Sequence, residues 1–448
     1  MTIVELYDDK PINNIVGTLA FNPEKVIYVG GYSKKHFYDK KMPVLRNYLF
    51  RKGYESLIIE YVQVRRDSLK DIVEKLEGIY SSNQECKFHV EVTGGEDLIL
   101  IGLGVLCQRY PEIELYQISS KLRNIRSFSM SSDDDTKLDI DCTNSVEENL
   151  LLHGASIISA NGSNEIPGGY AWKIEFFHYV EVMWDICCHG IEEDSDGHAP
   201  YYWNKVTTVL SFLEAEDENE TDSNNITAKN SILKSKFSND YDFDLFYNYI
   251  YYLVRCDLMD CKLEADFVKF IFKNEQVKAC LTKAGLILEL KTYLICSELL
   301  RGTNGDCLTS VTIDWDGDDD ISSNVKYLYD ADDPSSTIDT TNEIDVLANF
   351  GLVPYFISCK NGKFTSEELY KLNSVGEQFG KGYSVKIIVA TDIDFALGGT
   401  KNVILQRAAD MGIRVISGVH EMSDEEFKEE LIKKMELPKS NRTAKVKV

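Results

Sequence analysis

The segment from Asn342 to Lys363, NEIDVLANFGLVPYFISCKNGK, contains two apolar runs separated by a turn signal at Gly351. Side chains two residues apart on a β-strand point to the same face of the sheet. Glu343 and Asp345 lie two apart in the first run, so they share one face of the expected strand. The segment therefore predicts a hairpin that carries acidic side chains on one face.

The second run, Val353 to Ile357, leads into the triplet Ser358-Cys359-Lys360. Ser358 and Lys360 again share a face, so pairing of the two runs would bring a carboxylate on one strand to face a lysine on the next. A carboxylate can hold a divalent metal, and a lysine can orient or stabilise a phosphate and its attacking water. The pattern indicates hydrolysis of a phosphodiester. The alternative is a sheet edge with a few solvated charges.

The D…(E/D)-x-K layout of this hairpin resembles the restriction-endonuclease-like nuclease core. Ile313–Gly317 (IDWDG), Asn342–Val346 (NEIDV) and Phe356–Gly362 (FISCKNG) together resemble nucleases of type III CRISPR defence that carry an N-terminal CARF sensor domain. The resemblance implies an antiviral endonuclease that a cyclic oligoadenylate activates. Its expected cofactor is Mg²⁺ or Mn²⁺. Its expected activator is cyclic tetra-adenylate, with the ring size left open, and its substrate is DNA, RNA or both.

The resemblance also implies roles for individual residues. Asp345, Glu289 and the Cys359 carbonyl are expected to hold the metal. Lys360 is expected to position the attacking water and to stabilise the transition state. Ser358 stands where the commonest core has an acidic residue, so the metal loses one side-chain ligand and the serine is expected to hold a metal-bound water. The catalytic candidates are therefore Asp345, Lys360, Ser358 and Glu289.

Alternatives remain for several of these positions. Glu289 lies in the apolar segment Gly285–Leu294, GLILELKTYL, which corresponds to the first helix of this nuclease core, but it could also be an exposed helix charge. Asp316, after a strand expected at residues 311–315, is either a turn residue or a metal ligand. For the whole chain, the alternative to an enzyme is a regulatory protein that binds a cyclic nucleotide and whose nuclease-like fold has lost its chemistry.

Strands and helices alternate through the N-terminal region. The expected strands comprise residues 2–7, 25–29, 56–62, 86–92 and 113–118, and helical patterns follow the first four. This alternation predicts a parallel, doubly wound sheet. In such sheets, ligands bind beyond the carboxyl ends of the strands, at the point where strand order reverses.

Two of these strands end in glycine-rich turns, VGGYS at residues 29–33 and VTGGED at residues 92–97. Glycines let the backbone approach a phosphate, and the following helix N-terminus supplies N–H groups and a partial positive charge. We expect the two strands to be neighbours, with both turns lining one ligand site. Purely steric reasons for the glycines are the alternative. The candidate ligand-binding residues are Asn14, Gly30, Gly31, Tyr32, Ser33, Thr93, Gly94, Gly95 and Glu96.

The order of these elements and the TGG turn resemble a CARF domain. This resemblance implies a homodimer that binds one cyclic oligoadenylate ring across its two-fold axis. A Rossmann G-x-G-x-x-G is absent, so dinucleotide binding is not indicated.

The expected fold class is α/β with three domains. A Rossmann-like CARF domain is expected at residues 1–145, and a restriction-endonuclease-like α/β domain at residues 265–448. A largely helical connecting module, with an acidic linker at residues 214–230, is expected at residues 146–264. Ser145 and Glu148 have capping-box spacing, which predicts a helix start at the first boundary.

Composition limits the class of protein. The 448 residues, 44% of them hydrophobic, suit two or three folded domains. The sequence has no long apolar run and no signal-peptide pattern, so it predicts no membrane span and a cytoplasmic location with reduced cysteines. The net charge of −25 opposes tight nucleic-acid binding, because phosphate contacts usually need a basic surface. We therefore expect weak substrate affinity with a modest salt dependence.

Overall fold

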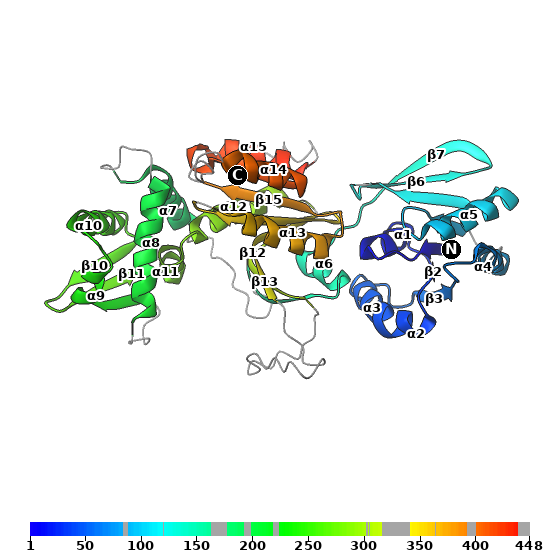
Figure 1. The fold of residues 1–448 in the computed structure, drawn as a ribbon, viewed down its shortest axis with the longest axis horizontal. Helices are drawn as coiled ribbons and strands as arrows, with labels where there is room; N and C mark the ends of the chain where they lie inside the picture. Colours follow the sequence, from blue (N-terminus) through cyan, green and yellow to red (C-terminus); the bar gives the residue numbers. More distant parts are fainter. Residues whose placement is uncertain are drawn as a thin grey trace.

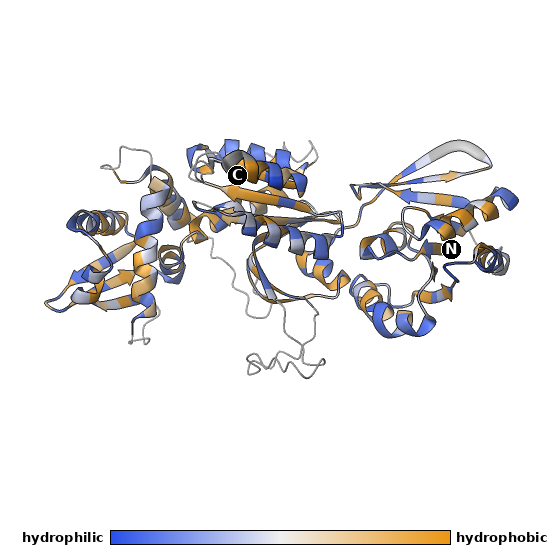
Figure 2. Cartoon of the chain, viewed as in Figure 1, coloured by the Kyte–Doolittle hydropathy of each residue, from blue (hydrophilic) through white to orange (hydrophobic). Residues whose placement is uncertain are grey.

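The computed structural model has three bodies arranged along one long axis (Figure 1). Figure 2 shows hydrophobic residues concentrated on the strands and on the helix faces that cover them. Within the part of the chain that is described, no helix is long and apolar enough to cross a membrane. The described residues are 1–83, 88–119, 121–162, 177–191, 199–217, 224–301, 303, 305–315, 341–362, 364–391 and 400–437.

The N-terminal unit is built on a seven-stranded sheet in the order β3-β2-β1-β4-β5-β6-β7. Strands β1 to β5 run parallel, and β6 and β7 continue the sheet as an antiparallel hairpin. The predicted parallel, doubly wound arrangement is confirmed. The strands are β1 (Thr2–Leu6), β2 (Lys25–Gly30), β3 (Ile58–Gln63), β4 (Phe88–Glu91), β5 (Glu114–Ile118), β6 (Asn124–Ser129) and β7 (Ser132–Asp139).

Helices cover both faces of this sheet because alternate strand residues are apolar on both sides. Val4 and Val29 pack with α4 and α5, whereas Ile3 and Val26 pack with α1 and α3. The helical segments are η1 (Pro11–Asn14), α1 (Val16–Phe21), α2 (Lys34–His36), η2 (Phe37–Lys41), α3 (Met42–Arg51), α4 (Leu69–Ser82) and α5 (Asp97–Arg109).

One expectation about this sheet is wrong. The strands that precede the two glycine-rich turns, β2 and β4, are not neighbours, because β1 lies between them and pairs with both. The strand order reverses between β1 and β4, so the loop after β1 lies with the two turns at the carboxyl edge of the sheet, where a ligand is expected.

The central unit holds a six-stranded sheet in the order β16-β15-β14-β13-β12-β8. Strands β13 and β14 form the predicted hairpin, in which Val346 lies opposite Ile357 and Phe350 opposite Val353. The strands are β8 (Ser156–Asn161), β12 (Gly305–Asp314), β13 (Thr341–Phe350), β14 (Val353–Lys360), β15 (Val385–Ala390) and β16 (Ile413–Ser417).

The two faces of this sheet carry different helices. Ile357 and Val389 pack with α12 and α15, while Phe356 and Ile388 pack with α6, α13 and α14. The helices of the unit are α6 (Val146–Leu152), α12 (Leu286–Leu300), α13 (Ser366–Gly380), α14 (Thr400–Asp410), η4 (Val419–Glu421) and α15 (Asp424–Met435).

The third body combines helices with a small antiparallel sheet, in the order β10-β11-β9. Its buried side chains form one core with the α12 face of the central sheet. Its elements are α7 (Phe177–His189), α8 (Ala199–Ala215), β9 (Asn225–Lys229), α9 (Asn230–Ser235), α10 (Asp240–Arg255), β10 (Met259–Leu263), β11 (Phe267–Phe272) and α11 (Glu275–Thr282).

The structure differs from the expected connecting module in three places. Its strand β8 pairs with β12 and is an edge strand of the central sheet. The limit expected at residue 265 separates β10 from β11, which pair directly, so we place both strands in one unit. Part of the acidic linker is strand β9, because Ile226 and Ala228 are buried against β11. Residues 218–223 of that linker lie outside the described residues.

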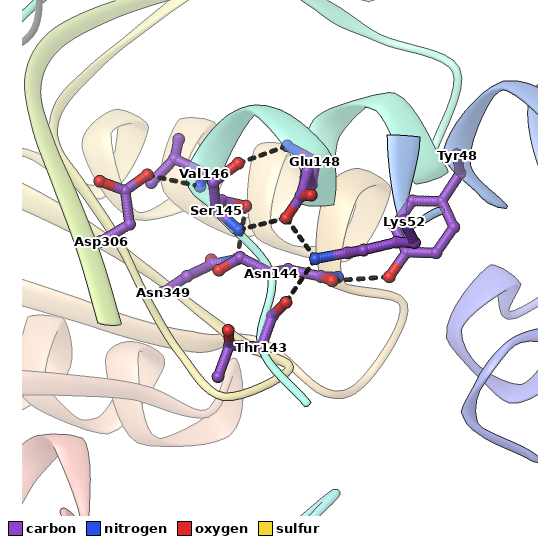
Figure 3. A network of polar contacts seen from close by, with 9 residues as sticks. All are labelled: Tyr48, Lys52, Thr143, Asn144, Ser145, Val146, Glu148, Asp306 and Asn349. Carbon is purple, nitrogen blue, oxygen red and sulfur yellow. Dashed lines mark hydrogen bonds and ion pairs between the residues drawn. The ribbon is translucent and has the colours of Figure 1, made fainter. Parts of the chain in front are cut away.

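A polar network joins the N-terminal and central units (Figure 3). On the N-terminal side, Lys52 Nζ donates to the Thr143 carbonyl and to Glu148 Oε2, each at 2.5 Å. Tyr48 Oη donates to Asn144 Oδ1 at 2.6 Å. Thr143 and Asn144 lie just before α6 and Glu148 lies in its first turn, so the C-terminal end of α3 and the residue after it hold the start of α6.

The central unit holds the same segment from the other side. Asp306 on β12 accepts from the Val146 N–H at 2.8 Å, and Asn349 on β13 donates to the Ser145 carbonyl at 3.0 Å. Ser145 and Glu148 form the predicted capping box. The start of α6 is therefore bonded to both units.

Candidate functional site

The hairpin of β13 and β14 opens at the candidate active site. Its ladder ends at the Val346–Ile357 pair, so the next backbone groups are free to bond side chains. Asp345 Oδ2 accepts from the Cys359 N–H at 2.6 Å and from Ser358 Oγ at 3.1 Å. Lys360 Nζ lies 3.7 Å from the same oxygen. The structure thus brings Asp345, Ser358 and Lys360 together, on the face expected from their spacing.

Lys360 is held by a second carboxylate that the sequence analysis missed. Glu368, in the first turn of α13, lies 3.0 Å from Lys360 Nζ. Burial by itself lowers the pKa of Lys360, but the carboxylates of Asp345 and Glu368 raise it, and the net shift is upward. The lysine is therefore a fixed cation rather than a base. The acidic start of the helix after SCKNG was the available signal for Glu368.

Glu289 approaches this site from α12, on the opposite face of the sheet from α13. Burial, and then the carboxylates of Asp345 and Glu343, raise the pKa of Glu289 to about 8. Glu289 is therefore not a freely exposed helix charge. Glu343 is close enough to Glu289 to help raise its pKa, and it was assigned no role from the sequence.

The donor atoms can be tested against the expected metal. Among the described residues, no group of three or more His, Cys, Asp and Glu side chains is arranged to hold a metal. Mg²⁺ keeps several of its waters and commonly uses one or two protein carboxylates, which Asp345 and Glu289 can supply. The N–H and carbonyl of a strand residue point to the same side, so the Cys359 carbonyl faces the Asp345 side as well. A divalent cation would also offset the negative charge that raises the pKa of Glu289. These residues fit the metal, whereas Asp316 and Gly317 lie outside the described residues.

The candidate ligand site lies at the carboxyl edge of the N-terminal sheet. Asn14 is buried, and its side chain accepts from the Asp8 N–H at 2.9 Å and donates to the Asp8 carbonyl at 2.8 Å. Asp8 Oδ2 in turn accepts from the Gly95 N–H at 3.3 Å. Gly95 has a φ of +89°, and a Cβ there would meet Leu6 at 2.6 Å, so the turn requires glycine. Asn14 thus holds the backbone of Asp8 in place, and Asp8 in turn bonds the TGG turn.

Arg66 contacts both glycine-rich turns. Its Nε lies 2.8 Å from Glu96 Oε1, and its guanidinium lies 4.9 Å from the centre of the Tyr32 ring. A Cβ on Gly31 would meet Arg66 at 2.1 Å. Arg66 was not among the candidates predicted from the sequence, although the pair Arg65-Arg66 follows β3 at the same edge. The ion pair with Arg66 offsets the negative charge of Glu96, which would otherwise repel a phosphate at this edge.

The hydroxyl groups of the remaining candidates at this edge accept hydrogen bonds from the protein backbone. Ser33 Oγ accepts from the His36 N–H at 3.1 Å and caps α2. Thr93 Oγ1 accepts from the Ile118 N–H at 2.6 Å, which ties the TGG turn to β5. Gly30 ends β2, and Gly94 packs against Asp8.

A buried carboxyl lies beneath the TGG turn. Glu91 is fully buried at the end of β4, and its carboxylate accepts from the N–H groups of Thr93 and Gly94. Burial raises the pKa of Glu91 from its usual 4.5 to about 7. The folded protein therefore keeps a proton between these two pH values that the unfolded chain releases.

This proton predicts a pH dependence of stability. The Glu91 contribution to the free energy of unfolding should fall by up to about 3 kcal/mol as pH rises from 4.5 to about 7, because the folded-state pKa is raised. Urea unfolding across this pH range should show that slope in the wild type and a smaller slope in Glu91→Gln. Glu74→Gln, at an exposed position, is the control. Equal slopes in wild type and Glu91→Gln would contradict the assignment.

Comparison with known proteins identifies the fold. No family model and no curated protein matches the sequence. Protein VC1899 from Vibrio cholerae is similar over 96% of this chain and 97% of its own, with a TM-score of 0.67 and 12% identity. Can2 from Sulfobacillus thermosulfidooxidans, solved in complex with cyclic tetra-adenylate, is similar over 96% of both chains, with a TM-score of 0.59 and 14% identity. The chain has the fold of Can2 and VC1899.

The expected α/β fold class is thus confirmed: a Rossmann-like, mostly parallel sheet comes first, and a second mixed α/β sheet follows, in a fold shared with Can2 over 96% of this chain. A type III CRISPR defence DNA nuclease activated by cyclic oligoadenylate is similar over 87% of this chain and 45% of its own, with a TM-score of 0.40 and 10% identity. That last similarity is too low to add to the fold assignment.

Proposed function

We propose that this chain is a metal-dependent endonuclease of type III CRISPR antiviral defence, activated by a cyclic oligoadenylate. The observation that carries the proposal is the opened hairpin, where Asp345 and Lys360 lie 3.7 Å apart beside Glu289. The shared fold with Can2, which was solved with cyclic tetra-adenylate, supports the same class of ligand at the N-terminal sheet edge. The ring size, and DNA or RNA as substrate, are left to experiment.

The chain's own residues have separate tasks in this reaction. Asp345, Glu289 and the Cys359 carbonyl would hold Mg²⁺ or Mn²⁺, which when bound polarises a phosphate oxygen and lowers the pKa of a bound water. Lys360 stays protonated, so its charge stabilises the negative charge that develops on the phosphate. Ser358 donates to Asp345 and fixes the orientation of that carboxylate.

One hydrogen bond joins the candidate ligand edge to the unit that holds the candidate active site. Tyr383, between α13 and β15, donates through Oη to Asn13 Oδ1 at 2.8 Å. Asn13 adjoins Asn14, which shapes the Asp8 turn at the ligand edge. On the nuclease side, α13 carries Glu368, the partner of Lys360. We propose that ligand binding shifts the Asp8 turn, and that α13 carries this shift as a rigid element from Tyr383 beyond its C-terminal end to Glu368 in its first turn.

Tyr383→Phe should weaken activation while leaving ligand affinity within about twofold, because only the bond to Asn13 is lost. We expect the ratio of activated to basal cleavage to fall roughly threefold to tenfold, the value of one hydrogen bond. Cleavage rates with and without cyclic tetra-adenylate measure this ratio, and calorimetry measures affinity. Tyr370→Phe, at an exposed position on α13, is the control. An unchanged ratio in Tyr383→Phe would exclude this route.

The decisive experiment for the function incubates the protein with Mn²⁺ and either plasmid DNA or RNA, with and without cyclic tetra-adenylate. We expect cleavage only when metal and ring are both present. We also propose a homodimer with one ring per dimer, because a ring with internal two-fold symmetry matches a two-fold axis. Calorimetry that detects no heat with tri-, tetra- or hexa-adenylate rings, or that gives one ring per monomer, would contradict the ligand assignment.

The second candidate is a regulatory protein that binds the ring but does not cleave nucleic acid. Ser358, in place of a carboxylate, favours this alternative, as does the lack of a three-ligand group among the described residues. Ring binding without cleavage of any substrate, across Mg²⁺ and Mn²⁺, would select it.

A further inference from the structure

A groove on the third body is lined by aromatic and lysine side chains, none of which belongs to the candidate active site. It has a volume of about 420 Å³ and lies between α8 and the segment that joins α9 to α10. Tyr201, Lys205, Thr208 and Phe212 line it from α8. Their spacing of four, three and four residues places them on one face of the helix. Tyr201 is 56% exposed and Phe212 53%, whereas Trp203 on the same helix is buried.

Two lysines are fixed beside these rings. Lys236 Nζ lies 5.0 Å from the centre of the Phe212 ring and 2.8 Å from Glu216. Lys205 Nζ lies 2.6 Å from Asp242. Each lysine has an acidic partner, so the groove does not attract polyanions by charge alone. Attraction there must come mainly from the exposed aromatic faces, with the lysines available to phosphates that reach them.

One residue that lines the groove is hydrogen-bonded to the loop that follows the candidate active site. Asn204, which lines the groove, donates through Nδ2 to the Asn361 carbonyl at 2.5 Å, and Asn361 Nδ2 donates to Asn204 Oδ1 at 2.9 Å. Asn361 directly follows Lys360 in the chain. These two hydrogen bonds fix α8 against the residue that follows β14, one residue from the catalytic lysine.

We propose that this groove binds unpaired bases of a single-stranded nucleic-acid substrate beside the cleavage site. Exposed aromatic rings stack on bases of any sequence, and lysines next to them contact the backbone. Stacking requires bases that are not already paired, so the groove selects single strands over duplex. This mode also suits a chain of net charge −25, which has little basic surface with which to hold a duplex. The proposal rests on the proposed nuclease function, since it names the form of its substrate.

Binding without cleavage tests the groove by itself. The full-length protein, in metal-free buffer with EDTA, is titrated into short fluorescein-labelled single-stranded DNA, single-stranded RNA and duplex DNA, and anisotropy is recorded. We expect single strands of both kinds to bind more tightly than duplex. Tyr201→Ala combined with Phe212→Ala should weaken single-strand binding about tenfold to a hundredfold, because stacking on each ring is lost. Duplex binding should not change.

Tyr251→Ala is the matched control, because Tyr251 is 54% exposed on α10 but does not line the groove. It should stay within about twofold of wild type. Equal single-strand affinity in the double variant and in Tyr251→Ala would overturn the proposal, as would wild-type protein that prefers duplex. A change of oligomeric state in the double variant, seen by size-exclusion chromatography with light scattering, would also overturn it and assign the groove to contact between copies. If the wild type binds single strands through these rings but never cleaves, the proposed function fails and the groove stands.

Discussion

Asp345→Asn is expected to abolish metal-dependent cleavage and to leave cyclic-oligoadenylate binding intact. Asp345 Oδ2 accepts hydrogen bonds from the Cys359 N–H and from Ser358 Oγ, and it lies 3.7 Å from Lys360 Nζ. One carboxylate therefore contacts all three residues at the end of β14. An amide removes the charge that a metal requires and puts donor hydrogens where an acceptor is needed. The expected loss is the largest of any single change.

The measurement pairs cleavage assays in Mn²⁺ with calorimetry of the ring. The candidate ligand edge lies on a different sheet, so the affinity for the ring should match that of the wild type. Circular dichroism controls for folding, because an unpaired buried group can destabilise a hairpin. Full activity in Asp345→Asn would mean that the catalytic roles are wrongly assigned.

Lys360→Ala is expected to slow cleavage roughly 10²–10³-fold, the cost of removing one preorganised charge from the transition state. Asp345 and Glu368 hold Lys360 Nζ from two sides, so the cation is in place before substrate arrives. Its raised pKa keeps Lys360 charged at neutral pH. The cleavage rate should therefore show no decrease near neutral pH that is caused by deprotonation of this lysine. Single-turnover rates on a saturating substrate measure the chemical step.

Ser358→Ala separates this effect from damage to the hairpin. The serine donates one hydrogen bond to Asp345, which also keeps the bond from the Cys359 N–H, so its removal should cost far less than loss of Lys360. Ser358→Glu should tighten metal binding if a carboxylate at this position adds a ligand. A loss in Ser358→Ala as deep as in Lys360→Ala would show that the serine has a direct role in the reaction.

The hairpin and the cluster of polar side chains at its open end could be predicted from the sequence because both depend on local rules. Side chains alternate on a strand, and a turn at Gly351 leaves one antiparallel register, so Asp345, Ser358 and Lys360 had to meet. Glu368 and Glu343 could not be assigned roles in the same way. A helix that begins after a loop can approach either face of a sheet, and the burial on each face decides which of its carboxylates reaches the lysine.

The alternation of strands and helices in the N-terminal region also followed from the sequence alone, and ligand binding at the carboxyl edge of that sheet stays a prediction. The order of strands did not follow from the sequence. A right-handed crossover permits a strand to be added on either side of its predecessor, so the place of β1 between β2 and β4 depended on packing across the whole sheet.

Segments far apart in the chain met only through the tertiary structure. Strand β8 joins a sheet whose next strand begins more than a hundred residues later, and β9 buries Ile226 although its flanks are acidic. Asn204 likewise bonds Asn361 across more than a hundred residues, and Arg66 reaches Glu96 from the end of a different strand. The sequence by itself determined the periodic elements and the chemistry that each carries, because those follow from neighbouring residues. Which elements share a sheet, and which side chains share a site, was decided by burial between distant segments, which no local pattern encodes.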